Sequence, residues 1–326
     1  MMAQPLPPDA APLHWGAEAL WEQLSPRLPG LSIEVVARIA STNSALLDRA
    51  CVASEARDEA DGSAAAQVRR STESQAFGRR AADLQPCLLV AEHQTAGRGR
   101  LGRPWQSLAG ASLTFSLALP LHPADWAGLS LAVGVALADA LDPINPLDPI
   151  NQAPAGPRPR IGIKWPNDLW LMDAAGDAGR KLGGILIETV SSGGQRLVVI
   201  GVGLNVLPLS ISSLEASTGF ACLQELQAGI GAPEVLARVA LPLVDALHRF
   251  ERSGFAAFAD AFAARDVLFQ RAITTTQADL PAGVAQGVSS TGALQVQTAQ
   301  GMRLLSSGEV SVRPVAGAAP VPGTPC

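Results

Sequence analysis

Lysine is nearly absent from this chain of 326 residues. Lysine and arginine together number 24, and only Lys164 and Lys181 are lysines. A chain so biased toward arginine is expected to keep lysine where an ammonium group has a specific task. Both lysines also fall in motif-like segments, so they are the first candidates for a functional site.

Paired cysteines and long apolar runs are missing too. The four cysteines are scattered without a C-x-x-C pair, which argues against a disulfide framework and a structural zinc site. No apolar run approaches the roughly 20 residues needed to cross a bilayer, and residues 1–12 lack the basic start of a secretory signal. We therefore expect a soluble protein of the cytoplasm.

The formal net charge of −5 disfavours a partner that is itself a polyanion, whether DNA or a membrane surface. Hydrophobic residues make up 48% and charged residues 16%, which is typical of a globular protein. On a prior of about 150 residues per domain, the length allows one substantial core and a smaller second one.

The sequence pattern predicts four parts: an N-terminal extension over 1–30, a larger domain over 31–267, a small β-domain over 268–315 and a disordered tail over 316–326. Strands of the larger domain are expected at 33–40, 86–91, 112–119, 161–164, 181–188 and 196–202, with helices at 129–141 and about 232–266. A further helix should open near residue 45, with Ser41 or Thr42 as its N-cap. The stretches 53–85 and 143–159 lack apolar periodicity and are predicted to be loop insertions.

A glycine–arginine loop joins two of these strands, between residues 96 and 105. Its glycines allow backbone N–H groups close to an anion, while Arg98, Arg100 and Arg103 can bind phosphate or carboxylate with two hydrogen bonds. The loop is not a dinucleotide fingerprint, because no helix follows it, and it lacks the lysine of a phosphate-binding P-loop. The alternative is a solvated basic turn or a nucleic-acid contact.

Each lysine sits in a motif of its own. Lys164 ends a strand and is followed by Trp-Pro-Asn-Asp up to Asp168, which is ordinary turn chemistry unless the cation has a role. Lys181 begins a strand that contains two glycines, and such a lysine can simply protect a sheet edge. Asn205 ends another buried strand and could bind a ligand or cap a turn.

No residue pattern indicates a covalent mechanism. The four histidines show no triad or metal spacing, and Ser107 and Ser116 look ordinary. We therefore expect a reaction in which bound groups attack one another while the protein positions them and stabilises charge.

Taken together, these segments resemble the catalytic domain of biotin protein ligases. The resemblance extends from about residue 33 to 313 and rests on Ser41-Thr42-Asn43, on the Gly-Arg-Gly-Arg-x-Gly-Arg-x-Trp run from Gly97 to Trp105, on Lys-Trp-Pro-Asn-Asp and on Lys-Leu-Gly-Gly-Ile-Leu. It implies an α+β fold like that of class II aminoacyl-tRNA synthetases, with a mixed sheet and a small C-terminal SH3-like barrel. Some relatives carry an N-terminal DNA-binding domain, and the roughly 30 residues before the first strand are too few for one, so no repressor role is expected.

The resemblance also implies a reaction and its site. Biotin and ATP would form biotinyl-5'-AMP with the help of Mg²⁺, and a lysine of a biotin carboxyl carrier protein would then accept biotin; a homodimer is left open. Catalysis is assigned to Lys181, Arg98 and Asp168, with Asp168 as the candidate Mg²⁺ ligand. Biotin binding is assigned to Ser41, Thr42, Asn43, Gln94, Arg98, Gly99, Arg100 and Lys181. ATP binding is assigned to Arg100, Arg103, Trp105, Lys164, Asn167 and Asn205.

Three other functions remain open from the residues. A lipoate or octanoate ligase or transferase would share the fold, but the Gly-Arg-Gly-Arg run favours biotin. A nucleic-acid-binding module is opposed by the acidic net charge. A nucleotide-dependent oxidoreductase is opposed by the missing helix after the glycines.

Overall fold

The computed structural model describes most of the chain. The described residues are 13–51, 84–144, 160–173, 176, 178–192, 195–208, 219–308 and 310–315. Most of the two predicted insertions, 53–83 and 145–159, and the predicted tail at 316–326 lie outside them. Within the described part, no helix combines the length and the apolar character needed to cross a membrane.

The chain forms two compact units. The first comprises the residues up to His122 together with Leu186–Gly203 and Ala232–Glu234, and the second comprises the remainder. The boundary between them falls within two strands, β6 (Gly179–Ser192) and β7 (Gln195–Asn205). The predicted division at residue 267 stays a prediction.

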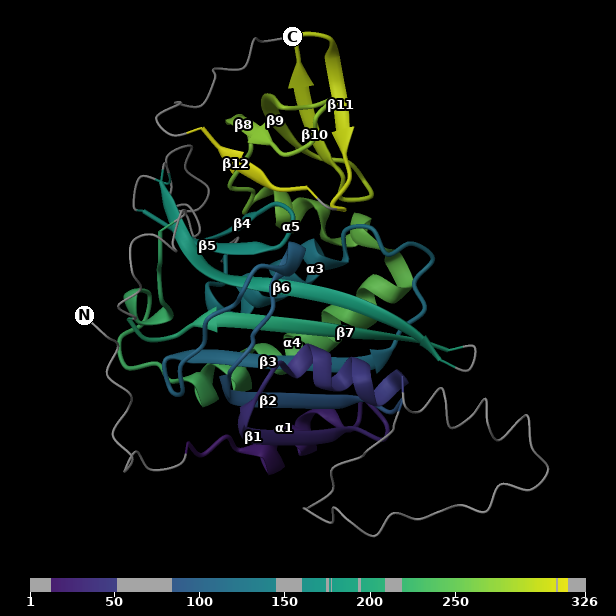
Figure 1. Ribbon diagram of the computed structural model, residues 1–326, viewed down its shortest axis with the longest axis vertical. Coiled ribbons are helices and arrows are strands. Elements are labelled where there is room, and N and C mark those ends of the chain that lie inside the picture. Colours follow the sequence, from purple (N-terminus) through teal and green to yellow (C-terminus); the bar gives the residue numbers. More distant parts are fainter. Residues whose placement is uncertain are drawn as a thin grey trace, which may run out of the picture. The chain divides into compact units, whose positions relative to one another are not determined.

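Strands β1 (Ser32–Ile39), β2 (Cys87–Gln94) and β3 (Ser112–Pro120) build the sheet of the first unit, which continues with β7 (Figure 1). β1 runs parallel to β2, and β2 runs antiparallel to β3, so the sheet is mixed as expected. Each of these three strands begins within one residue of the start predicted for it. Figure 1 draws the elements with these labels.

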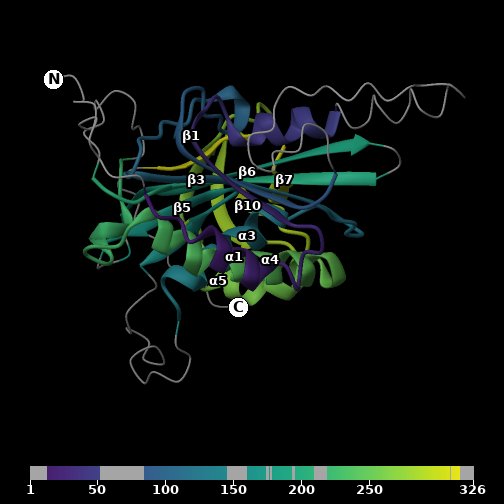
Figure 2. The same cartoon turned by 90° about the horizontal axis from the view of Figure 1, so that it is seen from below.

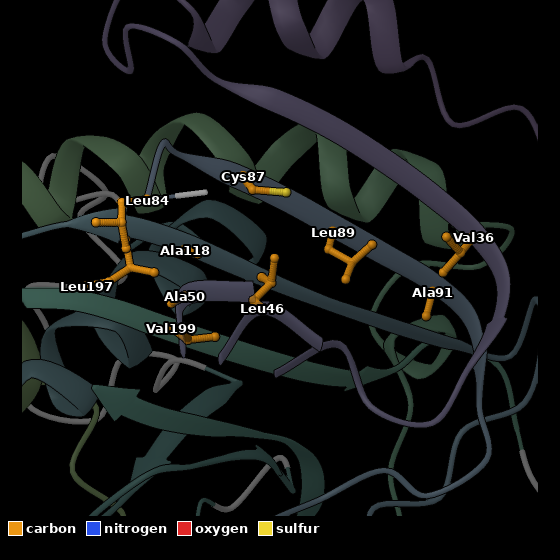
Figure 3. Packing of buried hydrophobic residues seen from close by; sticks show 10 residues of the cluster. All are labelled: Val36, Leu46, Ala50, Leu84, Cys87, Leu89, Ala91, Ala118, Leu197 and Val199. Atoms are coloured by element: carbon orange, nitrogen blue, oxygen red, sulfur yellow. The ribbon is translucent and has the colours of Figure 1, made fainter. Parts of the chain in front are cut away.

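The core of this unit is apolar and contains a helix over 42–51. Leu46 and Ala50, one helical turn apart, pack with strand residues from β1, β2, β3 and β7 (Figure 3). Cys87 belongs to the same core, and burial raises the pKa of its thiol to about 11. The thiols of Cys87 and Cys222 are buried, whereas Cys51 is exposed and Cys326 lies outside the described residues.

A helix that the sequence analysis did not predict, α1 (Ala17–Leu24), lies within the predicted N-terminal extension. Leu20 and Leu24 are buried, and the indole N–H of the buried Trp15 donates to Glu92 Oε1 at 3.0 Å. The helix is only eight residues long and follows a proline-rich start, so its pattern is weak in the sequence.

The second unit contains α3 (Leu129–Leu141), which contacts the strands β4 (Ile161–Lys164) and β5 (Asp168–Met172) and the short helix α5 (Ala259–Ala263). Figure 2 labels α3, α5 and β5 in a second view. β5 was missed in the sequence analysis, which placed only a turn there. The turn exists, but the chain returns at once, and β5 pairs antiparallel with both β4 and β6.

The helices expected at about 232–266 are present. α4 (Ala232–Ser253) ends at Gly254, whose φ of +62° lies in the left-handed region that favours glycine. A 3₁₀ turn, η3 (Phe255–Phe258), and α5 follow. The prediction of helices over this range is therefore confirmed, and Gly254 is where the first of them ends.

A small antiparallel sheet forms from residues 272–314, where the sequence predicted a small β-domain. Its strand order is β11-β10-β9-β8-β12, drawn from green to yellow in Figure 1. The bounds are β8 (Ala272–Thr275), β9 (Ala282–Val288), β10 (Leu294–Thr298), β11 (Gly301–Leu305) and β12 (Val312–Pro314).

Candidate active site

Most of the predicted site residues lie in two clusters, one in each unit. The serine–arginine cluster of the first unit comprises Ser41, Thr42, Asn43, Ser44, Gln94, Arg98, Ser116 and Glu188. The lysine cluster of the second unit comprises Lys164, Asn167, Asp168, Lys181 and Asn205.

Ser41 caps the helix over 42–51. Its Oγ accepts a hydrogen bond from the backbone N–H of Ser44 at 3.4 Å, three residues into the turn, as expected for an N-cap. The predicted N-cap is therefore confirmed as Ser41. The cap holds the buried side chains of Thr42 and Asn43 at the end of β1.

Thr42 is bonded to Gln94, the last residue of β2. Gln94 Oε1 accepts from the Thr42 backbone N–H at 2.8 Å and lies 3.1 Å from Thr42 Oγ1. Ser116 Oγ lies 2.6 Å from both Thr42 Oγ1 and Asn43 Oδ1. Gln94 Oε1 and Asn43 Oδ1 can only accept, so the Thr42 hydroxyl donates to Gln94, and the one hydrogen of the Ser116 hydroxyl is shared between Thr42 Oγ1 and Asn43 Oδ1.

The side-chain amide of Asn43 donates both of its hydrogens to other groups of the protein. Its Nδ2 donates to Glu188 Oε2 at 3.0 Å and to the Leu186 carbonyl at 3.3 Å, so both amide hydrogens are used. The amide lies against Gly201 of β7, where a Cβ atom would come within 2.3 Å of Asn43 Oδ1. Only glycine fits at this point of β7.

Arg98 projects from the glycine–arginine loop and is bonded within the same unit. Its guanidinium donates to Ser44 Oγ at 2.9 Å and to Glu188 Oε1 at 2.8 Å, while 46% of the side chain stays exposed. The loop backbone is closed by hydrogen bonds from Gly99 N–H to the Arg103 carbonyl and from Trp105 N–H to the Gly97 carbonyl.

The rest of the loop contains the other predicted contacts. Arg100 begins a 3₁₀ turn, η1 (Arg100–Gly102), and Arg103 is exposed. The Trp105 ring lies over Gly203 of β7, where a Cβ atom would approach the ring to 2.4 Å. Gly203 thus makes room for the Trp105 ring.

Both lysines of the chain lie against Asp168. The Lys181 ammonium is 2.8 Å from Asp168 Oδ1, and the Lys164 ammonium is 3.6 Å from Oδ2. The β4–β5 hairpin pairs Lys164 with Asp168, while β6 supplies Lys181. The Lys164 ammonium also lies 5.6 Å from the ring centroid of Trp170, within cation–π range.

The charge of this cluster is set by competition between burial and ion pairing. Burial favours the neutral acid, but the ammonium groups of Lys181 and Lys164 outweigh it, so the pKa of the Asp168 carboxyl lies below its ordinary value. At neutral pH the Asp168 carboxyl is therefore ionised. It is the counter-charge of both lysines.

Two amide side chains hold the backbone around this cluster. Asn205 Nδ2 donates to the Lys181 carbonyl at 3.3 Å and to the Ala221 carbonyl at 3.0 Å. Asn167 Nδ2 donates to the Ile185 carbonyl at 2.8 Å. Both amides therefore fix β6, the strand that carries Lys181.

The residues of the lysine cluster are poorly suited to bind Mg²⁺. Both oxygens of Asp168, the predicted Mg²⁺ ligand, face ammonium groups, which is the wrong charge environment for a cation. Across the residues that the structure describes, no three His, Cys, Asp or Glu side chains are grouped to hold a metal ion. The donor set does not fit a protein-held Mg²⁺.

Three members of the serine–arginine cluster were missed as site residues: Ser44, Ser116 and Glu188. Ser116 looks ordinary by itself, yet Ser112, Thr114 and Ser116 alternate along β3 and are all buried. A period-two row of hydroxyls inside an otherwise apolar strand was a usable signal. Glu188 gives no local signal, because its partners are distant in the sequence.

Comparison with known proteins places these motifs in a family. Residues 67–205 match the model described as the biotin/lipoate A/B protein ligase family, and residues 272–313 match that of the biotin protein ligase C-terminal domain.

Two curated relatives are about equally similar. The biotin–[acetyl-CoA-carboxylase] ligase of Paracoccus denitrificans is 31% identical over 239 residues, covering 68% of this chain and 88% of the relative. The bifunctional ligase/repressor BirA of Escherichia coli is 32% identical over 228 residues, covering 69% of this chain and 65% of the relative. The chain thus spans slightly less than two thirds of BirA.

Among solved structures, the biotin protein ligase of Aquifex aeolicus in complex with biotin and ATP shares the fold. The TM-score is 0.60 at 24% identity, with 87% of this chain and 99% of that chain covered. The α+β fold with its mixed sheet and C-terminal β-domain is confirmed by this likeness. Family models, relatives and fold agree, and the chain belongs to the biotin/lipoate A/B protein ligase family.

Proposed function

We propose that this chain is an ATP-dependent biotin protein ligase. It forms biotinyl-5'-AMP from biotin and ATP and then transfers biotin to a lysine of a biotin carboxyl carrier protein. The observation that carries the proposal is the convergence of both lysines of the chain on Asp168, in a member of this ligase family. The similarity to the Paracoccus denitrificans biotin ligase supports biotin as the acid.

In the first step a carboxylate oxygen of biotin attacks the α-phosphorus of ATP, and the bond to pyrophosphate breaks. Negative charge grows on the α-phosphoryl oxygens, where a fixed ammonium group stabilises it. We assign this role to Lys181, because Asp168 holds its Nζ in one place at the start of the reaction. In the second step the carrier amine attacks the acyl carbon, and AMP leaves.

We assign the binding of biotin to the serine–arginine cluster and the neighbouring loop. Ser41, Thr42 and Gln94 offer hydroxyl and amide groups, and Arg98, Gly99 and Arg100 belong to the loop that closes over biotin and its adenylate. The amide hydrogens of Asn43 are already used by Glu188 and Leu186, so it serves to position its neighbours.

Nucleotide binding falls to residues of the lysine cluster and of the glycine–arginine loop. We assign it to Arg103, Trp105, Lys164, Asn167 and Asn205, with Arg100 shared. Asn167 and Asn205 act mainly through β6, whose carbonyls they hold. Mg²⁺ would be held by the phosphates of ATP, whose oxygens would supply ligands, since the described residues hold no group of three His, Cys, Asp or Glu side chains for it.

We place the reaction in the cytoplasm, where ATP is available, and the free thiols of the described cysteines suit a reducing compartment. The net charge of −5 argues against DNA as a partner. A homodimer stays a prediction.

Pyrophosphate release tests the proposal. The protein is incubated with ATP, Mg²⁺ and biotin, lipoate or octanoate in turn, and pyrophosphate is measured. We expect pyrophosphate release when the acid is biotin, and none when it is lipoate or octanoate. Release driven by lipoate or octanoate would favour the second candidate, a lipoate or octanoate ligase, which the same family model includes.

Transfer is tested with a biotin carboxyl carrier domain as acceptor. We expect biotin on its target lysine, detected by mass spectrometry, and none on a matched acceptor in which that lysine is replaced by arginine. Adenylate formation without transfer to any carrier would contradict the second half of the proposal.

A further inference from the structure

Glu188 is the carboxylate of the serine–arginine cluster, and both of its oxygens accept hydrogen bonds. Oε1 accepts from Arg98 at 2.8 Å, and Oε2 accepts from Asn43 Nδ2 at 3.0 Å. The side chain is 23% exposed, so the pair with Arg98 is only partly screened by water. One carboxylate therefore joins the glycine–arginine loop to the helix that begins after Ser41.

The contact has a consequence for any anion that binds Arg98. A ligand carboxylate within hydrogen-bond distance of this guanidinium would lie within roughly 6 Å of the Glu188 carboxylate, and like charges at that separation repel. Ser44, which also accepts a hydrogen bond from Arg98, is neutral and imposes no such conflict. The anion must therefore compete with Glu188 for Arg98.

We propose that Glu188 is an internal competitor of the substrate carboxylate: it holds Arg98 until an anionic acid displaces it. This inference rests on the proposed function, which assigns Arg98 to the acid. The contact lowers the affinity for carboxylates and keeps the loop attached to the helix over 42–51 before substrate binds. Glu188 acts through Arg98 and is a positioning residue, not a catalytic one.

Glu188→Gln separates the two contacts of Glu188. The glutamine carbonyl can still accept from Asn43 Nδ2, which preserves the anchor of Asn43. Its amide N–H₂ group can only donate, as does the guanidinium, so the bond to Arg98 is lost. The variant therefore frees Arg98 with little change in shape.

Titration calorimetry compares biotin with biotinamide, which has no carboxylate. An exposed ion pair contributes up to about 1 kcal/mol, or about fivefold in affinity. We expect Glu188→Gln to bind biotin about fivefold more tightly than the unmodified protein, with less than a twofold change for biotinamide. Weaker or unchanged biotin binding, or an equal gain for both ligands, would overturn the proposal.

A matched control comes from the C-terminal sheet. Arg303 pairs with Asp279 at 3.0 Å, and the Arg303 side chain is 47% exposed, close to the value for Arg98. Asp279→Asn breaks this pair and should leave the ratio of the two affinities as it is. A shift of that ratio in the control would show a general charge effect and overturn the assignment to Glu188.

A second measurement does not depend on biotin. Trypsin cleaves after arginine, and the loop contains Arg98, Arg100 and Arg103. We expect faster cleavage in this loop for Glu188→Gln than for the unmodified protein, because the loop loses an attachment; equal rates would contradict it. If the unmodified protein bound no biotin while trypsin behaved as expected, the proposed function would fail and the attachment by Glu188 would stand.

Discussion

The ammonium group of Lys181 lies 2.8 Å from Oδ1 of Asp168, and the other oxygen of that carboxylate faces Lys164. A chain with only two lysines thus holds both on one acid. Because the carboxylate is ionised, each ammonium keeps a fixed position. Such fixed charge is what stabilises a developing phosphoryl charge without reorganisation.

Removing the cation from Lys181 should stop the first reaction step. We expect Lys181→Ala to lower biotin-dependent pyrophosphate release by at least about 100-fold, since one preorganised charge contributes several kcal/mol to the barrier. The matched control is Arg180→Ala, which removes the neighbouring cation and its exposed pair with Glu225. Unchanged release in Lys181→Ala would exclude Lys181 from the mechanism.

Neutralising Asp168 should destabilise the fold in a pH-dependent manner. Asp168→Asn removes the carboxylate that pairs with the buried Lys164 and with Lys181, which we expect to cost about 2–4 kcal/mol at pH 7. The pKa of Asp168 is lowered by folding, so its contribution is present above about pH 4 and is lost as the pH falls further.

Urea unfolding at pH 7 and at pH 3 measures this difference between protein and variant. We expect the gap in unfolding free energy to shrink at pH 3. A gap that grows in acid would mean that Asp168 is not the ionised partner of the lysines.

Asp266 should show the opposite pH dependence. Burial raises its pKa to about 6, and Leu268 N–H donates to Oδ1 while Oδ2 lacks a hydrogen-bond partner among the described residues. The folded state therefore binds a proton more tightly than the unfolded state, so Asp266 favours folding at pH 4 and loses that contribution as the pH rises through 6.

The test again compares unfolding free energies. We expect the value for the unmodified protein minus that for Asp266→Asn to fall between pH 4 and pH 7, because asparagine does not titrate. A difference that stays constant over this range would show that the folded-state pKa is not raised.

The tryptophan of the Lys-Trp-Pro-Asn-Asp motif links it to the C-terminal sheet. Trp165 is buried, and its indole N–H donates to the Gly292 carbonyl at 3.0 Å. Trp165→Phe leaves this buried carbonyl without its donor and removes ring volume, so we expect a loss of about 2–3 kcal/mol in urea unfolding.

Trp21→Phe is the matched control for this contact. Trp21 donates to the Leu31 carbonyl at the same 3.0 Å but is 48% exposed, so water can replace the bond. We expect a loss below about 1 kcal/mol. Equal losses in both variants would show that burial of the Trp165 bond is not what matters.

Gly201 should tolerate no side chain. Gly201→Ala places a methyl group 2.3 Å from Asn43 Oδ1, so Asn43 must leave its contacts with Ser116 and Glu188. We expect a loss of about 2 kcal/mol in stability and weaker biotin binding. In the helix α3, Gly134→Ala meets no atom closer than 3.5 Å and should be neutral or slightly stabilising. Similar losses for both glycines would contradict the steric argument.

The local features of the chain were predictable because local chemistry encodes them. The strands β1, β2 and β3 follow from short apolar runs, and the Ser41 cap from its place before a helical pattern. β5 was missed because Pro166 and Asn167 have the chemistry of a turn and the strand spans only five residues.

By itself the sequence determined which side chains could do the chemistry: two lysines, a glycine–arginine loop and a Ser-Thr-Asn turn, all encoded within short windows. Only the tertiary structure decided their partners. Asn43 and Glu188 are 145 residues apart in the chain, and Arg98 and Glu188 are 90 apart, yet they meet in one cluster. Strand pairing and register bring such residues together, and both depend on packing across the whole sheet, which no local pattern records.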